Sequence, residues 1–400
     1  MAAAAKMQMY LALWLVVGLA SFCGTEASRE RLLQGTQPPL YVRMADTALQ
    51  IWNSSGPGKE QWNYERGVLL YGIQEVWKRT NDAKYLEFVQ NRTDAFLEPD
   101  GSIPTYKMAD YNLDNIRSGT ILLFLWKLTG ETKYKEAADL LREQLKSHPR
   151  TEEGGFWHKQ IYPYQMWLDG LFMAEPFYAE YAKLFDEPDD FDDIVLQFKL
   201  MEEHARDPET GLLYHGYDES RQMAWADPET GTSPSFWGRS VGWYFMGLVD
   251  TLDFFPKNHP ERDALIGILQ RLAEAVAKVQ DPQSAVWWEV LDQGGREGNY
   301  LESSASCMFV YAYAKAVKKG FISGSTYKGV YETGFAGIQT QFVQDRPDGG
   351  VDLNSTVSVG GLGGDPYRNG TYEYYLSEAV VTNDAKGVGP FLLASLYLLR

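Results

Sequence analysis

The side chains best suited to chemistry in this chain are two aspartates at the start of apolar helical segments. Asp114 stands in NLDNIRSG and Asp169 in QMWLDGLFMAEP. Each could simply cap a helix, although capping fits Asp169 less well because Trp167 and Leu168 already suit a helix. Two carboxylates that face one aromatic cavity raise each other's pKa, and burial adds to the rise. A carboxylic acid that stays protonated near neutral pH can act as a general acid.

Two histidines and one arginine could support these carboxylates. His158 (GGFWHKQIYP) and His215 (LLYHGYD) lie between predicted helices, where a structural role is the ordinary interpretation. Arg239, between Trp237 and Trp243 in SFWGRSVGW, begins an apolar helix. A cation at a helix N-terminus opposes the macrodipole, so we expect an anionic partner for it. That partner is either an internal carboxylate or a ligand carboxylate bound through two hydrogen bonds.

Helix-period segments that must position these residues recur to the end of the chain, and about twelve are predicted. One set is apolar nearly all round and must be buried on every side, with segments that start at Arg117, Trp167, Gly238, Glu302 and Gly387. The other set is amphipathic and charged, as in TKYKEAADLLREQLKS. This alternation predicts an all-α fold with six inner and six outer helices, an (α/α)6 barrel in a single domain. A two-domain helical bundle is the alternative.

Such a barrel gathers polar and aromatic groups at one end. Consecutive inner helices run parallel, so their N-termini share one opening and favour an anionic ligand there. The segments that enter the inner helices carry Trp62, Tyr64, Asp114, Trp167, Asp169, Trp237, Arg239 and Tyr300. A Gly- and Pro-rich stretch at about 345–378 lies between the last two predicted helices, and a loop of this length is usually functional or disordered.

Composition excludes several classes of function. A formal net charge of -17 disfavours nucleic acid as a partner, because phosphate binding needs a basic surface. Two cysteines exclude a disulfide scaffold and a cysteine-based zinc site. The five histidines are not spaced as metal ligands, and the chain has no HExxH, P-loop or nucleophile-elbow motif. We therefore expect no metal and no cofactor.

The N-terminus has the pattern of an export signal. Lys6 precedes the apolar run LALWLVVGLASF, and small residues follow up to Ala27. We expect a signal peptide at 1–27, a single catalytic domain at 28–400, and a secreted, extracellular protein that no longer contacts the membrane after cleavage. Four sequons, at Asn53, Asn91, Asn354 and Asn369, fit a secreted glycoprotein.

Three motifs in order carry a family resemblance: GGFWHKQIYPYQMWLDGLFMAEPFYAEYAKLF, LLYHGYDES and SFWGRSVGWYFMGLVDTL. From roughly Tyr41 to the C-terminus the chain resembles glycoside hydrolase family 105, the unsaturated rhamnogalacturonyl hydrolases. The resemblance implies an (α/α)6 barrel without a metal. It also implies hydrolysis of the 4,5-unsaturated uronate that polysaccharide lyases leave at the non-reducing end of an oligosaccharide. The double bond is protonated and hydrated, and the resulting hemiketal opens and releases the neighbouring sugar.

The resemblance also implies roles for individual residues. Asp169 looks like the general acid and base, and Asp114 like its carboxylate partner. The residues that look like substrate contacts are His215, Arg239, Trp237, Trp243, His158, Lys159, Trp167 and Tyr64. The implied substrate is unsaturated galacturonate linked to rhamnose in pectin fragments.

Other functions stay open at this point. The related family 88 acts on unsaturated glucuronyl residues of other lyase products, and an inverting glycosidase could use the same two aspartates on a saturated sugar. A non-catalytic sugar-binding protein and an epimerase are further alternatives. The leaving sugar is not readable from the sequence.

Overall fold

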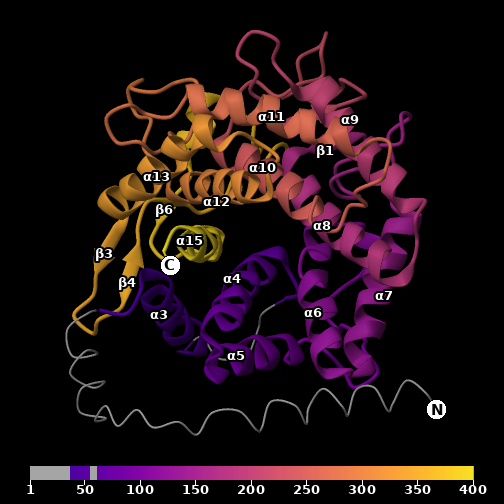
Figure 1. The fold of residues 1–400 in the computed structure, drawn as a ribbon. Coiled ribbons are helices and arrows are strands. Elements are labelled where there is room, and N and C mark those ends of the chain that lie inside the picture. Colours follow the sequence, from indigo (N-terminus) through magenta and orange to yellow (C-terminus); the bar gives the residue numbers. More distant parts are fainter. Residues whose placement is uncertain (1–36, 55–60, 400) are drawn as a thin grey trace, which may run out of the picture. The chain divides into compact units, whose positions relative to one another are not determined.

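Twelve long helices form two concentric rings in the computed structural model, which describes residues 37–54 and 61–399 (Figure 1). The inner ring contains α4 (Tyr64–Thr80), α6 (Gly119–Thr129), α8 (Leu168–Phe185), α10 (Gly238–Thr251), α12 (Ser303–Lys319) and α15 (Ala385–Leu398). The outer ring contains α3 (Leu40–Ser54), α5 (Ala83–Asp94), α7 (Thr132–Ser147), α9 (Asp190–Ala205), α11 (Arg262–Lys278) and α13 (Gly324–Gln341).

Burial separates the two rings as the hydrophobic pattern predicts. Every residue of α10 is buried, and α8 is buried continuously from Leu168 to Ala182. Outer helices such as α7 bury one face and expose the other. A helix without a polar face has no side to turn to water, so it must lie inside a ring of other helices. The predicted (α/α)6 barrel is confirmed.

The ring closes between the two ends of the described chain. Each inner helix contacts the next one, and α15 packs on α4. The outer helix α3 packs beside α15, so the first and last long helices of the described part form one pair of outer and inner helices. Arg43 of α3 adds a link to the segment at 345–349, because its guanidinium donates to Asp345 (2.6 Å) and to the carbonyl of Gly349 (2.8 Å).

Short strands shape the loops between the helices. They form three antiparallel pairs: β1 (Gln165–Trp167) with β2 (Gly216–Asp218), β3 (Val343–Asp345) with β4 (Val351–Leu353), and β5 (Thr356–Val357) with β6 (Val380–Val381). In the first pair Met166 lies opposite Tyr217. Two 3₁₀ turns, η1 (Met108–Asp110) and η2 (Leu113–Ile116), precede α6.

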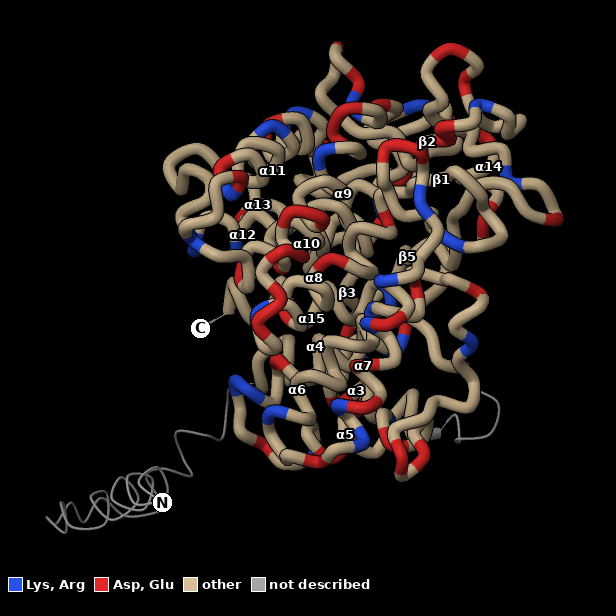
Figure 2. The backbone as a smooth tube through the Cα atoms, turned by 90° about the vertical axis from the view of Figure 1, so that its right-hand side faces the viewer, with Lys and Arg blue, Asp and Glu red and all other residues tan. Residues whose placement is uncertain are grey.

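The stretch at 345–378, expected to be irregular, has defined structure. It contains β4 and β5 and the short helix α14 (Tyr372–Ser377). We call residues 354–378 the covering segment, because they pack on the loops at the N-terminal ends of the inner helices. In Figure 2, β1, β2, β5 and α14 gather towards the same side of the view.

Residues 39–400 form one compact unit. The predicted signal peptide at 1–27 and its cleavage site lie outside the described residues. Among the residues that are described, no helix is both long and apolar enough to cross a membrane.

Candidate active site

Four predicted site residues meet where the inner helices begin. Tyr64 starts α4, Asp114 lies in the 3₁₀ turn before α6, and Asp169 and Arg239 lie in the first turns of α8 and α10. Burial raises the pKa of Tyr64 well above its usual value; Asp114 and Asp169 raise it further, and Arg239 opposes them. These charges all act on one hydroxyl, so the helix starts converge as the barrel topology predicts.

Asp169 is held by a histidine from the next loop. Its side chain is nearly buried, with the residue 8% exposed, and Oδ2 lies 3.1 Å from Nε2 of His215. On the other side of that ring, Nδ1 of His215 lies 2.7 Å from the hydroxyl of Tyr375. The N-cap of α8 is Trp167, which makes no side-chain cap bond. Asp169 is therefore directed into the site, where His215 and Tyr375 fix its orientation.

The expected rise in the pKa of Asp169 is wrong for the free protein. Burial does raise this pKa, but His215, through its charge and hydrogen bonding, and the more distant His158 outweigh burial and hold the pKa below its usual value. The pattern of two nearby aspartates did not reveal a histidine at hydrogen-bonding distance. The Asp169 carboxyl of the free protein is thus ionised near neutral pH.

Asp114 occupies a second buried position, 9% exposed, in the same site. Its carboxylate pairs with Lys159 (Oδ2 to Nζ, 2.6 Å) and lies 3.5 Å from Nε2 of His158. The N-cap of α6 is Ser118, so Asp114 does not cap that helix. Burial is the main cause that lowers the pKa of His158, to about 4, and it outweighs the opposing effects of Asp114 and Asp169. His158 is therefore a neutral ring between the two carboxylates.

Aromatic rings form the walls of the site. Trp167 stacks between His158 (centroids 4.3 Å apart, 17° between planes) and Tyr162 (4.8 Å, 20°). Trp237 stacks on Tyr375 at 5.6 Å and 10°. Trp167 is 4% exposed and Trp237 1%, so these stacked rings form a rigid apolar wall beside the buried polar groups.

Trp243 lies deeper than the other predicted contacts. Its ring is 1% exposed, stacks on Phe172 at 4.7 Å and meets Tyr64 edge-on at 6.4 Å. Phe172 and Trp243 thus form the floor beneath the Tyr64 ring.

Arg239 has no direct ion pair among the described residues. Its Nη1 donates to the carbonyl of Val357 and lies 3.5 Å from Oγ of Ser304, while Nε has no hydrogen-bond partner in the described part of the chain. Two buried carboxylates, Glu289 and Glu302, lie within its electrostatic range. The internal carboxylate expected as a partner of Arg239 is therefore nearby without direct contact. The Nε of Arg239 is left as a donor without a partner among the described residues.

Sequence reasoning missed several residues of this site. Glu289 accepts from Trp237 Nε1 (2.7 Å), and Glu302 caps α12 and accepts from the backbone of Val357 (3.0 Å). The covering segment adds Tyr375 and Arg368, whose side chain donates to the Tyr162 hydroxyl at 2.7 Å. For Tyr375 and Arg368, the length of the Gly-rich stretch that contains them was a signal in the sequence. Glu289 and Glu302 had no such signal.

Comparison with known proteins identifies the family. The profile described as Glycosyl Hydrolase Family 88 matches residues 42–400. A solved structure of a family 105 glycoside hydrolase from C. acetobutylicum ATCC 824 is 47% identical, with a TM-score of 0.87 over 90% of this chain and 99% of that one. The chain belongs to the family 88/105 glycoside hydrolases.

Two curated relatives of this glycoside hydrolase extend the comparison. The unsaturated rhamnogalacturonyl hydrolase YesR of Bacillus subtilis is 31% identical over 64% of this chain and 74% of its own length. Protein Atu3128 of Agrobacterium fabrum is 40% identical over 57% of this chain and all of its own length. The family resemblance seen in the motifs is confirmed, and the chain is a glycoside hydrolase.

Proposed function

We propose that this glycoside hydrolase removes a 4,5-unsaturated galacturonate linked to rhamnose from pectin oligosaccharides produced by lyases. One observation carries the proposal: the nearly buried Asp169 carboxyl, held by His215, shares an aromatic site with Asp114. The relationship to YesR, which is named for this substrate class, supports it.

The reaction adds water across the C4–C5 double bond. Asp169 gives its proton to C4 while water forms the new bond to C5 and returns a proton to the Asp169 carboxylate. The C5 hemiketal opens to a ketone and frees the ring oxygen as a hydroxyl on C1. The resulting C1 hemiacetal breaks its bond to the neighbouring sugar, which leaves as an alcohol. One water is consumed and the carboxyl is regenerated.

His215 prepares Asp169 for this role. Burial raises the pKa of Tyr375 well above its usual value, so its hydroxyl stays protonated and can donate to Nδ1 of His215. The other ring nitrogen, Nε2, then faces the Asp169 carboxyl. A bound uronate adds negative charge and excludes water, and both changes raise the pKa of Asp169 towards the protonated state that the reaction needs.

The other site residues bind the substrate in this proposal. Trp167 and Trp237, both buried among other rings, shape the wall of the site, and the free Nε donor of Arg239 with Lys159 supplies positive charge for the uronate. Asp114 keeps Lys159 and His158 in place and acts as the second carboxylate of the site.

A panel of lyase products tests the substrate assignment. Oligosaccharides from rhamnogalacturonan, ulvan and glycosaminoglycan lyases are incubated with the enzyme, and loss of the ultraviolet band of the unsaturated uronate is followed. We expect fastest decay with the rhamnogalacturonan products. Hydrolysis of saturated oligosaccharides at a comparable rate would contradict hydration of a double bond, and preference for a glycosaminoglycan product would contradict the pectin substrate.

A further inference from the structure

A large cavity opens at the end of the barrel away from Asp169. Its volume is about 490 Å³, and its wall consists mainly of the C-terminal halves of inner helices. On α8, Glu180 lines the cavity, eleven residues after Asp169, which is about 16 Å along a helix. Phe172 lies between these two positions in the sequence of α8. The cavity is therefore separate from the candidate active site, and its size suits a small organic ligand.

Most charges around the cavity are already paired. Lys78 pairs with Glu75 (2.7 Å), and Lys127 with Glu180 (2.5 Å). Lys315 bridges Asp250 and Asp253, at 2.6 Å from each. The lining contains six Lys or Arg and four Asp or Glu, a surplus of two positive charges in a chain whose net charge is -17. This end of the barrel thus favours an anion against the background of the whole protein.

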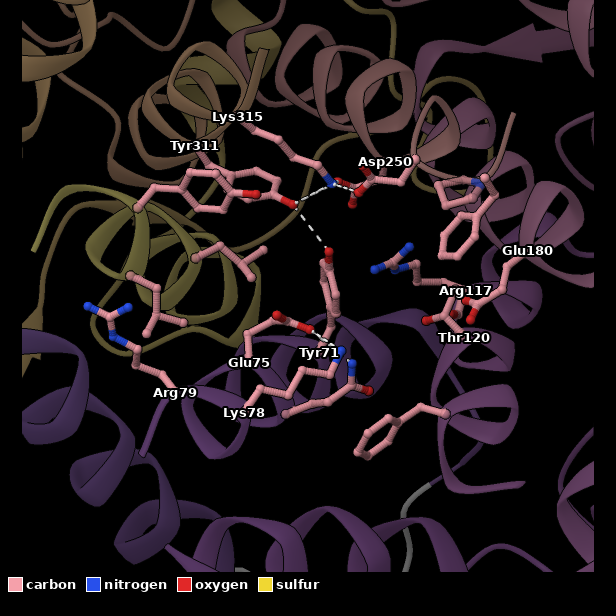
Figure 3. A pocket seen from close by; sticks show the side chains of 18 of the residues that line it. Tyr71, Glu75, Lys78, Arg79, Arg117, Thr120, Glu180, Asp250, Tyr311 and Lys315 are labelled. Atoms are coloured by element: carbon pink, nitrogen blue, oxygen red, sulfur yellow. Dashed lines mark hydrogen bonds and ion pairs between the residues drawn. The ribbon is translucent and has the colours of Figure 1, made fainter. Parts of the chain in front are cut away.

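The deepest cation, Arg117, has two unpaired donors among the described residues. Arg117 is 1% exposed, and its guanidinium lies over the rings of Phe172 (4.0 Å) and Tyr71 (4.9 Å). Its Nε and Nη1 have no hydrogen-bond partner among the described residues. Figure 3 shows this guanidinium directed towards Tyr71 at the centre of the cavity. Buried guanidinium donors are costly to leave unpaired, and a carboxylate satisfies them with two parallel bonds.

Unpaired acceptors line the same cavity. Oδ2 of Asp250 and Oε1 of Gln74 are buried without a hydrogen-bond partner in the described part of the chain. Hydroxyl groups could donate to both. Tyr71, Tyr311 and Tyr397 offer ring surface, and Figure 3 shows the hydroxyls of the first two joined by a hydrogen bond of 3.2 Å. A ligand that satisfies the whole set carries a carboxylate, several hydroxyls and an apolar ring face.

We propose that this cavity is a second ligand site for a small hydroxylated carboxylate of the sugar-acid type. The carboxylate binds Arg117, the hydroxyls donate to Asp250 and Gln74, and the ring lies against the tyrosines. The exposed cations Arg79 and Lys318 line the cavity and attract the anion. The assignment does not depend on which substrate the active site hydrolyses.

Calorimetric titration of the full chain with sodium D-galacturonate tests the site, with D-galactose and acetate as partial probes. We expect galacturonate to bind at least about tenfold more tightly than either partial probe. The double variant Arg79→Glu/Lys318→Glu should weaken galacturonate binding by about tenfold, and Arg117→Gln should abolish it. The control Lys146→Glu/Lys328→Glu changes the net charge equally at exposed positions that do not line the cavity, and it should bind like the unmodified protein.

A soaked crystal locates the bound acid. Density for the carboxylate on Arg117 would support the proposal. Three results would overturn it: no binding, equal binding of galactose, or binding lost in Lys159→Glu at the active site and unchanged in Arg79→Glu/Lys318→Glu. Because Arg79 and Lys318 are exposed, Arg79→Glu/Lys318→Glu should fold and tests the site even if Arg117→Gln does not fold.

Discussion

At the scale of single residues, the 3.1 Å contact between Asp169 and His215 decides the protonation state of the site. A carboxyl buried among rings alone would keep its proton, whereas this one is ionised until a ligand changes its surroundings. The charge and desolvation that a bound uronate brings therefore decide whether Asp169 carries the proton.

Asp169→Asn tests the proposed proton donor. An amide keeps the shape but cannot transfer the proton, so we expect kcat to fall by about 10²–10⁴-fold with little change in substrate binding. Steady-state rates on an unsaturated oligosaccharide measure kcat, and calorimetry measures binding. The matched control is Asp186→Asn at the exposed C-cap of the same helix, where φ is 58° and asparagine is well tolerated. Near-normal turnover by Asp169→Asn would exclude it as the acid.

Tyr375→Phe tests the positioning of His215. Without the hydroxyl, the histidine loses the hydrogen bond at Nδ1 that orients its ring towards Asp169, and a lost hydrogen bond of about 1 kcal/mol corresponds to about a fivefold lower kcat. We expect KM to stay nearly constant and the pH profile of kcat to move. Tyr372→Phe in the same short helix removes a hydroxyl bonded to the backbone of Glu297 and should leave the profile in place. A profile that Tyr375→Phe leaves unmoved would show a purely structural role.

The sequence predicted which side chains lie together better than it predicted the direction of the pKa shift of Asp169. Asp114, Asp169, His158 and His215 come together because helix starts converge in a barrel, which follows from the hydrophobic pattern alone. Tyr375 could not be foreseen, since it is 160 positions from His215 and no local rule brings them together. The pKa of Asp169 was predicted in the wrong direction for a similar reason, because His215, which lowers it, lies in a different loop.

At the scale of elements, the covering segment connects the start of α10 with the start of α12. Its backbone at Val357 is bonded to Glu302 and Arg239, so one loop contacts two inner helices. Its Gly360 lies directly on the Trp237 ring, where an added Cβ would come within 2.3 Å of the ring. The sequence left open whether this stretch is functional or disordered. Its contacts with the inner helices, which exist only in the folded barrel, give it a defined structure.

Gly360→Ala tests this packing. Trp237 cannot move aside easily, because it is 1% exposed and its Nε1 is bonded to Glu289, so the segment itself must shift. We expect kcat/KM to fall by about tenfold, and the melting temperature to drop by a few degrees for a cost of about 1–3 kcal/mol. Gly329→Ala on α13, with no atom within 4 Å of the added carbon, is the control and should be neutral or slightly stabilising. Unchanged kinetics in Gly360→Ala would contradict the close contact.

At the scale of the whole molecule, neutral buried histidines make the fold sensitive to acid. His148 is 4% exposed, and burial lowers its pKa to about 4. An unfolded histidine titrates near 6.5, so between about pH 6.5 and 4 the unfolded state binds a proton that the folded state excludes. This residue therefore stabilises the fold less as the pH falls through that window, by up to about 3 kcal/mol.

His148→Gln isolates that contribution. The variant loses the bond to the Trp157 carbonyl (2.7 Å) and should be less stable than the original chain at pH 7.5. Its deficit should shrink by about 3 kcal/mol towards pH 4, because glutamine does not titrate. Urea unfolding of both proteins across the pH range measures the difference. A deficit that stays constant with pH would mean that folding leaves the pKa of His148 unchanged.

The packing of α3 against α15 also constrains the order in which the helices can pair during synthesis. Five of the helix pairs join neighbours along the chain and can form as they leave the ribosome, but the sixth joins helices that residues 54 and 385 separate by 331 positions. Until α15 emerges, the apolar sides of α4 and α12 that it covers stay open to water and to other nascent chains. Loss of α15 should accordingly leave a secondary-structured but aggregation-prone intermediate that chaperones retain, rather than a smaller working enzyme.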